Sequence, residues 1–93
     1  MRRTLLPSTA FIRAARRLTK KNALAALGVQ AALDTLADDA FHSSLKTHKL
    51  TGDMAGSWAC SAGYDLRIVF DIIQHEGAEA ILLLTVGTHD EVY

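Results

Sequence analysis

The chain has 93 residues, of which 49% are hydrophobic, and its 10 basic and 10 acidic residues give a formal net charge of zero. A chain of this length forms one small domain with a single core and no room for a large internal cavity. Its single cysteine, Cys60, excludes a disulfide framework and a four-cysteine zinc site, and its apolar content excludes a disordered chain. We therefore expect any chemistry on an exposed face or in a shallow cleft.

No segment of the sequence predicts a membrane span or an export signal. The longest apolar-rich stretch, residues 23–33, is too short to cross a bilayer and is interrupted by Gly28 and Gln30. Arg2 and Arg3 are followed by neither an apolar h-region nor a small-residue cleavage site. These features predict a cytoplasmic protein.

The first part of the chain predicts a short strand followed by a helical hairpin. Residues 3–6 are typical of a strand, which Pro7 ends because proline has no backbone N–H for a ladder hydrogen bond. Ser8 or Thr9 can cap a first helix and Asn22 a second one, in which Gly28 costs up to about 1 kcal/mol relative to alanine. The apolar positions of the two helices are Phe11, Ala14, Ala15 and Leu18, and then Leu24, Leu27, Val29, Ala31, Leu33 and Leu36.

The neutral net charge hides an asymmetry along the chain. Seven of the ten basic residues precede position 22, whereas the first acidic residue is Asp34. A basic face of this kind suits a polyanion or an acidic protein partner, although a solvated helix face is the simpler explanation from charge alone. The seven residues are Arg2, Arg3, Arg13, Arg16, Arg17, Lys20 and Lys21.

The second half of the chain changes to the two-residue period of strands. Residues 57–61 predict a short strand, residues 65–73 a half-buried strand, and residues 80–86 a central strand covered on both faces, with a turn at 74–77. The order of elements predicts an α+β domain in which the N-terminal strand and the helical hairpin pack on an antiparallel sheet. Trp58 and Cys60 are expected on one face of their strand; in the next, Leu66, Ile68, Phe70 and Ile72 share one face and Asp65, Arg67, Val69 and Asp71 the other.

Two histidines, an arginine, a carboxylate and a tyrosine occur in three short motifs. The motifs are His48-Lys49-Leu50-x-Gly52, Asp65-Leu66-Arg67, and Gly87-Thr88-His89-Asp90-Glu91-Val92-Tyr93. This set suits metal-free cleavage of RNA, because RNA supplies its own nucleophile in the 2′-hydroxyl group. Histidine transfers protons near neutral pH, and the arginine fork matches the charge that develops on a phosphoryl group.

Each of these residues also has a simpler interpretation. His48 and His89 can be ordinary surface histidines, or metal ligands together with Asp65, although the sequence contains no His-x-x-x-His pairing. Asp65 and Arg67, two residues apart on one strand, can form a surface ion pair. Cys60 is expected to be a small buried hydrophobic residue.

The three motifs, in this order, resemble the RelE/ParE toxin superfamily. They are most similar to the YafQ-like branch of RelE ribonucleases from bacterial type II toxin–antitoxin operons. The likeness covers residues 46–93 well, and residues 1–45 mainly through the same order of a strand and a helical hairpin. It implies one RelE-like domain over residues 1–93, with the α+β fold of microbial ribonucleases. The matching stretches are H-x-L-x-G from His48, Gly56-Ser57-Trp58, D-L-R-I-V-F from Asp65 and G-T-H-D-E-V-Y from Gly87.

The resemblance implies a toxin that cuts mRNA on the ribosome without metal or cofactor and that binds a cognate antitoxin protein. In it His48 or Asp65 takes the proton of the 2′-hydroxyl, Arg67 holds the scissile phosphate and His89 protonates the 5′-oxygen. Tyr93 stacks on a base or orients the 2′-hydroxyl. The residues expected to contact mRNA or 16S ribosomal RNA are Lys46, Lys49, Arg13, Arg16, Arg17 and Lys20; the basic helix can instead receive an acidic antitoxin segment.

Two alternatives remain within this superfamily. ParE-like gyrase inhibitors lack the ribonuclease residues, so the two histidines with Asp65 argue against that branch. Ser61 stands four residues before Asp65, where YafQ-like members can carry a further catalytic histidine. The alternative function is therefore a weakly active or non-catalytic homologue that acts by binding a protein, either an antitoxin or gyrase.

Overall fold

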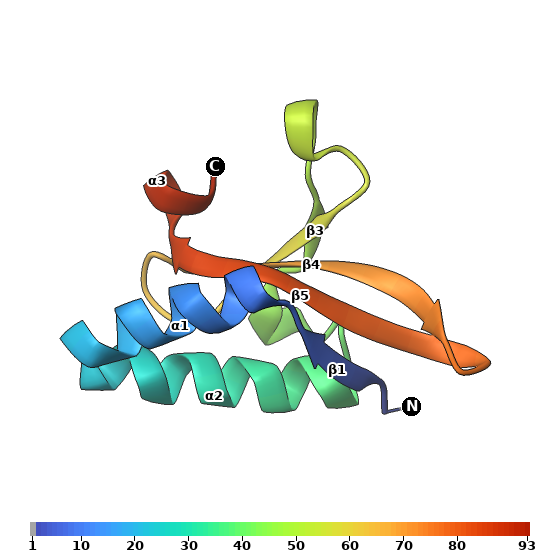
Figure 1. Ribbon diagram of the computed structural model, residues 1–93, viewed down its shortest axis with the longest axis horizontal. Helices are drawn as coiled ribbons and strands as arrows, with labels where there is room; N and C mark the ends of the chain where they lie inside the picture. The colour runs from blue at the N-terminus through green and yellow to red at the C-terminus, as the bar shows by residue number, and fades with distance from the viewer. Residues whose placement is uncertain (1) are drawn as a thin grey trace.

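The computed structural model describes residues 2–93, in which two long helices pack on one face of a five-stranded sheet (Figure 1). Within these residues no helix is long and apolar enough to cross a membrane. The elements are, in order, β1 (Thr4–Pro7), α1 (Thr9–Lys21), α2 (Ala23–Asp38), the 3₁₀ turn η1 (Ser43–Leu45), β2 (His48–Lys49), the 3₁₀ turn η2 (Gly52–Met54), β3 (Trp58–Ser61), β4 (Leu66–His75), β5 (Ala78–Thr88) and α3 (His89–Val92).

The sheet has the strand order β1-β5-β4-β3-β2. Strands β2 to β5 are antiparallel neighbours, and β1 joins the edge of this sheet parallel to β5. An ion pair from Arg3 Nη2 to Glu79 Oε1, 2.8 Å long, also ties the start of the chain to β5. The predicted α+β class is confirmed, and Pro7 is the last residue of β1 because an edge strand tolerates a missing N–H.

Both predicted helix caps are present. The side chain of Ser8 accepts a hydrogen bond from the Phe11 N–H, and that of Asn22 accepts from the N–H groups of Leu24 and Ala25. These bonds satisfy N–H groups that have no partner within the first turn of a helix. The two helices therefore begin where the sequence predicts.

The buried face of α2 differs from its apolar pattern. Leu24 and Leu27 are 78% and 69% exposed, and the residues that face the core are mostly smaller: Ala25, Val29, Ala32, Leu36 and Ala37. The helix lies close to the turn after β3, since a Cβ atom on Gly28 would lie 2.5 Å from the carbonyl oxygen of Ala62. Gly28 thus permits close packing within an unbroken helix.

The main core lies between α1, α2 and the sheet. Strand β5 contains a bulge that changes which of its residues face this core. Phe70 pairs with Leu83 and Val69 with Thr85, which leaves Leu84 as an extra residue. Leu83 and Val86 consequently both belong to the main core, although they are an odd number of positions apart in the strand. The predicted faces of β3 and β4 are confirmed, since the main core includes Trp58, Cys60, Leu66, Ile68, Phe70 and Ile72.

A smaller apolar cluster lies on the opposite face of the sheet. It consists of buried Ala59, Val69 and Val92 with partly buried Leu50, Met54 and Leu84. Figure 1 shows α3 and the segment between β2 and β3 on this side, away from α1 and α2. Polar residues of the three sequence motifs lie on this second face, which positions the candidate site.

Candidate active site

Strand register places His48 and Arg67 on the same face of the sheet. His48 pairs with Ala59, and Ala59 pairs with Val69. Residues paired directly across strands project to one face, so His48 shares the face of the smaller apolar cluster. Arg67 lies two residues before Val69 on β4 and projects to this face as well.

Helix α3 brings His89 and Tyr93 to this face. Val92 is buried against Ala59 and Val69, which docks the short helix on the sheet. The His89 N–H donates to the carbonyl oxygen of Asp65 at 3.1 Å, and the Tyr93 N–H donates to the carbonyl oxygen of His89, also at 3.1 Å. These contacts hold both rings next to the end of β5.

Tyr93 contacts both histidines. Its hydroxyl lies 3.4 Å from Nε2 of His48, and its ring centre lies 4.5 Å from that of His89, edge to face. Burial raises the pKa of Tyr93 above its ordinary value of 10.0, and the nearby Arg67 cation offsets part of this effect. The phenol is therefore protonated at neutral pH and acts as a hydrogen-bond donor.

The tautomer of the neutral His48 ring follows from its two neighbours. Its Nδ1 lies 3.0 Å from the carbonyl oxygen of Lys46, and a carbonyl oxygen only accepts, so Nδ1 must carry a hydrogen. In the neutral ring Nε2 then has the free lone pair. Nε2 is the atom that faces the Tyr93 hydroxyl, so His48 presents a base toward the open side of the site.

Two shallow hollows surround these side chains. One, of about 540 Å³, is lined by His48 and Tyr93 together with the loop after β2. The other, of about 290 Å³, is lined by Lys46, Arg67 and Ser61, which pairs with Arg67 across β3 and β4. One N–H of the Arg67 guanidinium donates to the carbonyl oxygen of Leu66 at 2.9 Å, and the fork has further donors for a bound anion.

Asp65 lies outside the strand on which the sequence placed it. It precedes β4 with φ +58°, in the left-handed region that a strand residue does not adopt. The prediction that Asp65 and Arg67 are neighbours on one strand face is therefore wrong, because the turn from Gly63 continues through Asp65. No ion pair joins the two side chains within residues 2–93. Asp65 nevertheless lines the Arg67 hollow, and its carbonyl oxygen accepts the hydrogen bond from the His89 N–H.

The predicted RNA-binding residues divide between two parts of the molecule. Lys46 lines the Arg67 hollow and Lys49 lines the His48 hollow. The Nζ of Lys49 lies 5.3 Å from the centre of the Trp58 ring. The basic residues of α1 lie on the helix side of the sheet, away from His48 and Tyr93; they are Arg13, Arg16, Arg17 and Lys20.

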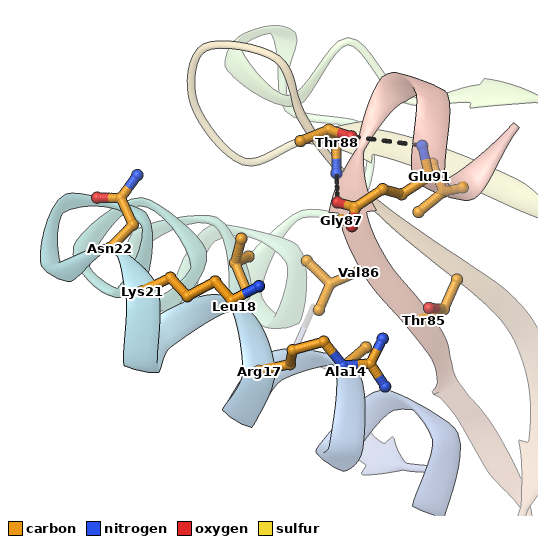
Figure 2. A pocket seen from close by; sticks show the side chains of 11 residues that line it. Ala14, Arg17, Leu18, Lys21, Asn22, Thr85, Val86, Gly87, Thr88 and Glu91 are labelled. Carbon is orange, nitrogen blue, oxygen red and sulfur yellow. Dashed lines mark hydrogen bonds between the residues drawn. The ribbon is translucent and has the colours of Figure 1, made fainter.

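A third cavity separates α1 from α3. Figure 2 shows Arg17 extending from α1 into a cleft of about 460 Å³, with Glu91 on its opposite wall. The basic helix α1 therefore lies across this cleft from α3. His48, Arg67, His89 and Tyr93 do not line the cleft.

The sequence interpretation missed one interaction that supports the site. Thr88 and Glu91 form a capping box at the start of α3, and the signal for it was the Thr-x-x-Glu spacing within the last motif.

The residues considered as metal ligands are not arranged as a ligand set: residues 2–93 contain no group of three or more His, Cys, Asp or Glu side chains placed to share an ion. Burial raises the pKa of Cys60 to about 12, which fits its predicted role as a core residue.

No protein-family model and no curated protein matches the sequence. Solved structures do match the fold. A YoeB/ParE toxin from Agrobacterium tumefaciens superimposes with a TM-score of 0.76 at 16% identity, covering 92% of this chain and 98% of that one. YafQ from E. coli gives a TM-score of 0.77 at 14% identity, with 98% of each chain covered. The E. coli DinJ-YafQ toxin–antitoxin complex gives 0.76 at 15% identity, with coverage of 100% and 99%. The chain therefore has the fold of the YoeB and YafQ toxins.

Proposed function

We propose that this protein is the toxin of a type II toxin–antitoxin system and a metal-independent endoribonuclease that cuts ribosome-bound mRNA in the cytoplasm. The observation that carries the proposal is the position of Tyr93, which lies between His48 and His89 on the face that also holds Arg67. Two histidines beside a shallow, cationic hollow are the minimal set for acid–base cleavage of RNA. The shared fold with YoeB and YafQ supports the same conclusion.

In the proposed reaction His48 is the general base. Its Nε2 has the free lone pair, because Nδ1 is held by the Lys46 carbonyl. Nε2 takes the proton of the 2′-hydroxyl group, and the 2′-oxygen forms a bond to the adjacent phosphorus. Asp65 is the weaker candidate for this role, since it lines the Arg67 hollow and not the hollow that His48 shares with Tyr93.

Arg67 and His89 act on the other side of the phosphate. The Arg67 guanidinium binds the non-bridging oxygens, where negative charge develops in the transition state. His89, in its protonated form, gives a proton to the 5′-oxygen as the bond from phosphorus to that oxygen breaks. The products are a 2′,3′-cyclic phosphate and a free 5′-hydroxyl. In this reaction the 2′-hydroxyl takes the place of the Tyr93 hydroxyl at Nε2 of His48, and Tyr93 orients it by donating a hydrogen bond to its oxygen.

The proposed partner is an antitoxin protein encoded beside this chain. Solved complexes of the same fold, DinJ-YafQ and YoeB-YefM, pair each toxin with a second protein. Expression of this chain alone is expected to arrest growth, and co-expression of the adjacent reading frame is expected to relieve the arrest. Arrest that the neighbour leaves unchanged would contradict the pairing.

Cleavage with purified components tests the chemistry. Ribosomes programmed with a defined mRNA are incubated with the protein in EDTA, at a concentration that leaves the ribosomes intact, and the RNA ends are mapped. We expect internal cuts that leave a 2′,3′-cyclic phosphate or a 3′-phosphate. Products with 3′-hydroxyl ends, or chemistry that requires an added divalent ion, would refute the mechanism.

The alternative is a homologue that binds an antitoxin without cutting RNA. The observation that favours it is Ser61, which lines the Arg67 hollow where the resemblance admits a histidine. Serine does not act unaided as a base at neutral pH. An intact complex with the neighbouring protein, combined with no cleavage on ribosomes, would establish this alternative.

A further inference from the structure

We propose that Glu91 is a positioning residue of this site, which fixes α3 through Thr88 and so holds His89 and Tyr93 against His48. The inference rests on the proposed ribonuclease function. Glu91 itself touches none of the three rings; it lines the cleft behind α3 (Figure 2).

Helix α3 needs an external support. It has four residues, His89–Val92, and a single turn of helix is unstable in isolation because nucleation costs more than one hydrogen bond returns. Yet this turn carries His89 and leads directly into Tyr93. Whatever holds the turn in place therefore sets the positions of two proposed functional groups together.

The capping box provides this support. The Thr88 N–H donates to Oε1 of Glu91 at 2.8 Å, and the Glu91 N–H donates to the hydroxyl oxygen of Thr88 at 3.3 Å. Figure 2 shows both bonds as dashed lines at the mouth of the cleft. The hydrogen bonds from Thr88 are also the main reason why the pKa of Glu91 lies below its ordinary value, with smaller effects from Arg17 and Lys21 across the cleft.

Gly87 makes room for the same arrangement. A Cβ atom at this position would lie 3.0 Å from Oε1 of Glu91 and 3.3 Å from Cγ1 of Val92. The Glu91 side chain thus folds back over the end of β5, where a larger residue would displace it. Gly87, Thr88 and Glu91 together act as a latch that joins β5 to α3.

The latch connects to the site through the backbone. The N–H of His89, the residue after Thr88, donates to the Asp65 carbonyl, and the His89 carbonyl accepts from the Tyr93 N–H. If the first turn of α3 opens, the His89 and Tyr93 rings move relative to His48, while Arg67 on β4 stays in place. Release of the latch should therefore slow the chemical step more than it weakens RNA binding.

The test compares Glu91→Ala, Glu91→Gln and the control Asp34→Ala, which removes an exposed carboxylate from α2 on the other side of the sheet. For Glu91→Ala we expect kcat to fall about tenfold or more with KM changed by less than about threefold. Glu91→Gln should stay within about threefold of wild type, because a glutamine oxygen accepts the same bond from Thr88. Asp34→Ala should match wild type.

A double-variant cycle and a spectroscopic signal complete the design. Thr88→Val removes the hydroxyl acceptor, and combining it with Glu91→Ala should add little, because both break one network. The imidazole proton resonances of His89 should shift in Glu91→Ala, since its ring leaves the edge-to-face contact with Tyr93.

Wild-type kcat in Glu91→Ala, or equal loss in Glu91→Gln and Glu91→Ala, would overturn the proposal. Failure of the ribonuclease function is distinguishable, because wild type would then not cut RNA either. In that case the His89 resonances decide the positioning role alone: a shift in Glu91→Ala but not in Glu91→Gln supports it, and any other pattern refutes it.

Discussion

At the level of single residues, the site depends on groups that can be removed without opening the core. Arg67 and His89 project from the sheet face opposite α1 and α2, whereas Phe70 is fully buried in the main core. The side chains that we propose for catalysis are therefore different from those that stabilise the core. This separation can be measured.

Arg67→Ala and His89→Ala should leave the free energy of unfolding within about 1 kcal/mol of wild type, as most surface changes do. Their single-turnover cleavage rate should fall by about 100-fold or more, because each group acts on charge or a proton in the transition state. Phe70→Ala should show the reverse and lose about 3–5 kcal/mol of stability through a core cavity. Thermal unfolding and cleavage are measured on all three variants, and full cleavage by Arg67→Ala or His89→Ala would show that the site is assigned incorrectly.

Cys60 should make the protein less stable at high pH. Burial raises its pKa from 9.0 to about 12 in the folded state, so the unfolded thiol loses its proton first as the pH rises above 9. Stability then falls by up to about 1.4 kcal/mol per pH unit between these two values. Denaturant unfolding of wild type and Cys60→Ala between pH 8 and pH 10.5 tests this; only wild type should show the additional slope, and parallel pH profiles would contradict it.

Among the elements, α2 shows how backbone approach can outweigh helix propensity. Alanine normally stabilises a helix by up to about 1 kcal/mol relative to glycine. At position 28 the added Cβ would lie 2.5 Å from the Ala62 carbonyl oxygen, and this oxygen belongs to the backbone and cannot rotate away. The gain in helix propensity and the cost of this close contact therefore change the free energy of unfolding in opposite directions.

Gly28→Ala should therefore destabilise the protein by about 1–3 kcal/mol, the usual cost of forcing extra volume into a packed contact. The control is Ala31→Gly, an exposed position on the same helix, which should cost about 0.5–1 kcal/mol through propensity alone. Chemical denaturation measures both. Stabilisation by Gly28→Ala would mean that α2 can move away from the turn after β3 without loss.

The elements also show which features a sequence predicts and which it does not. The caps at Ser8 and Asn22 and the alternation along β4 were predictable because they depend on neighbouring residues. The exposure of Leu24, the left-handed backbone at Asp65 and the extra residue Leu84 in β5 were not, because each depends on packing between distant segments. The candidate site follows the same division. The motifs predicted the four side chains that we propose for it, whereas the capping box of Thr88 and Glu91 was not predicted.

Considered as a whole, the molecule presents a basic helix on one side and the candidate site on the other. Arg13, Arg16 and Lys20 line none of the hollows around His48 and Arg67 and do not line the cleft of Glu91. We expect these three cations to steer an acidic partner during its approach. Steering acts on the association rate, and salt screens it. The two sides can therefore be tested separately.

A variant in which Arg13, Arg16 and Lys20 are all replaced by glutamine should bind the protein encoded by the neighbouring reading frame with a lower association rate constant. The rate constant of wild type should fall with rising salt, and that of the variant should depend on salt less steeply, with dissociation rates similar in both. Stopped-flow binding between 50 mM and 500 mM salt measures these constants. Equal salt slopes would show that the basic face is only solvated.

The strand order has a consequence for growth of this protein into fibrils. Its two longest strands, β4 and β5, lie inside the sheet, and the outermost strands are β2, with two residues, and β1, with four residues ending in Pro7. A copy that extended the sheet at β1 or β2 by main-chain hydrogen bonds would meet only these short segments, one of them with a missing N–H. The second half of β4 differs, because residues 71–75 pair with β5 alone, so this stretch is the longest strand edge that another copy can reach.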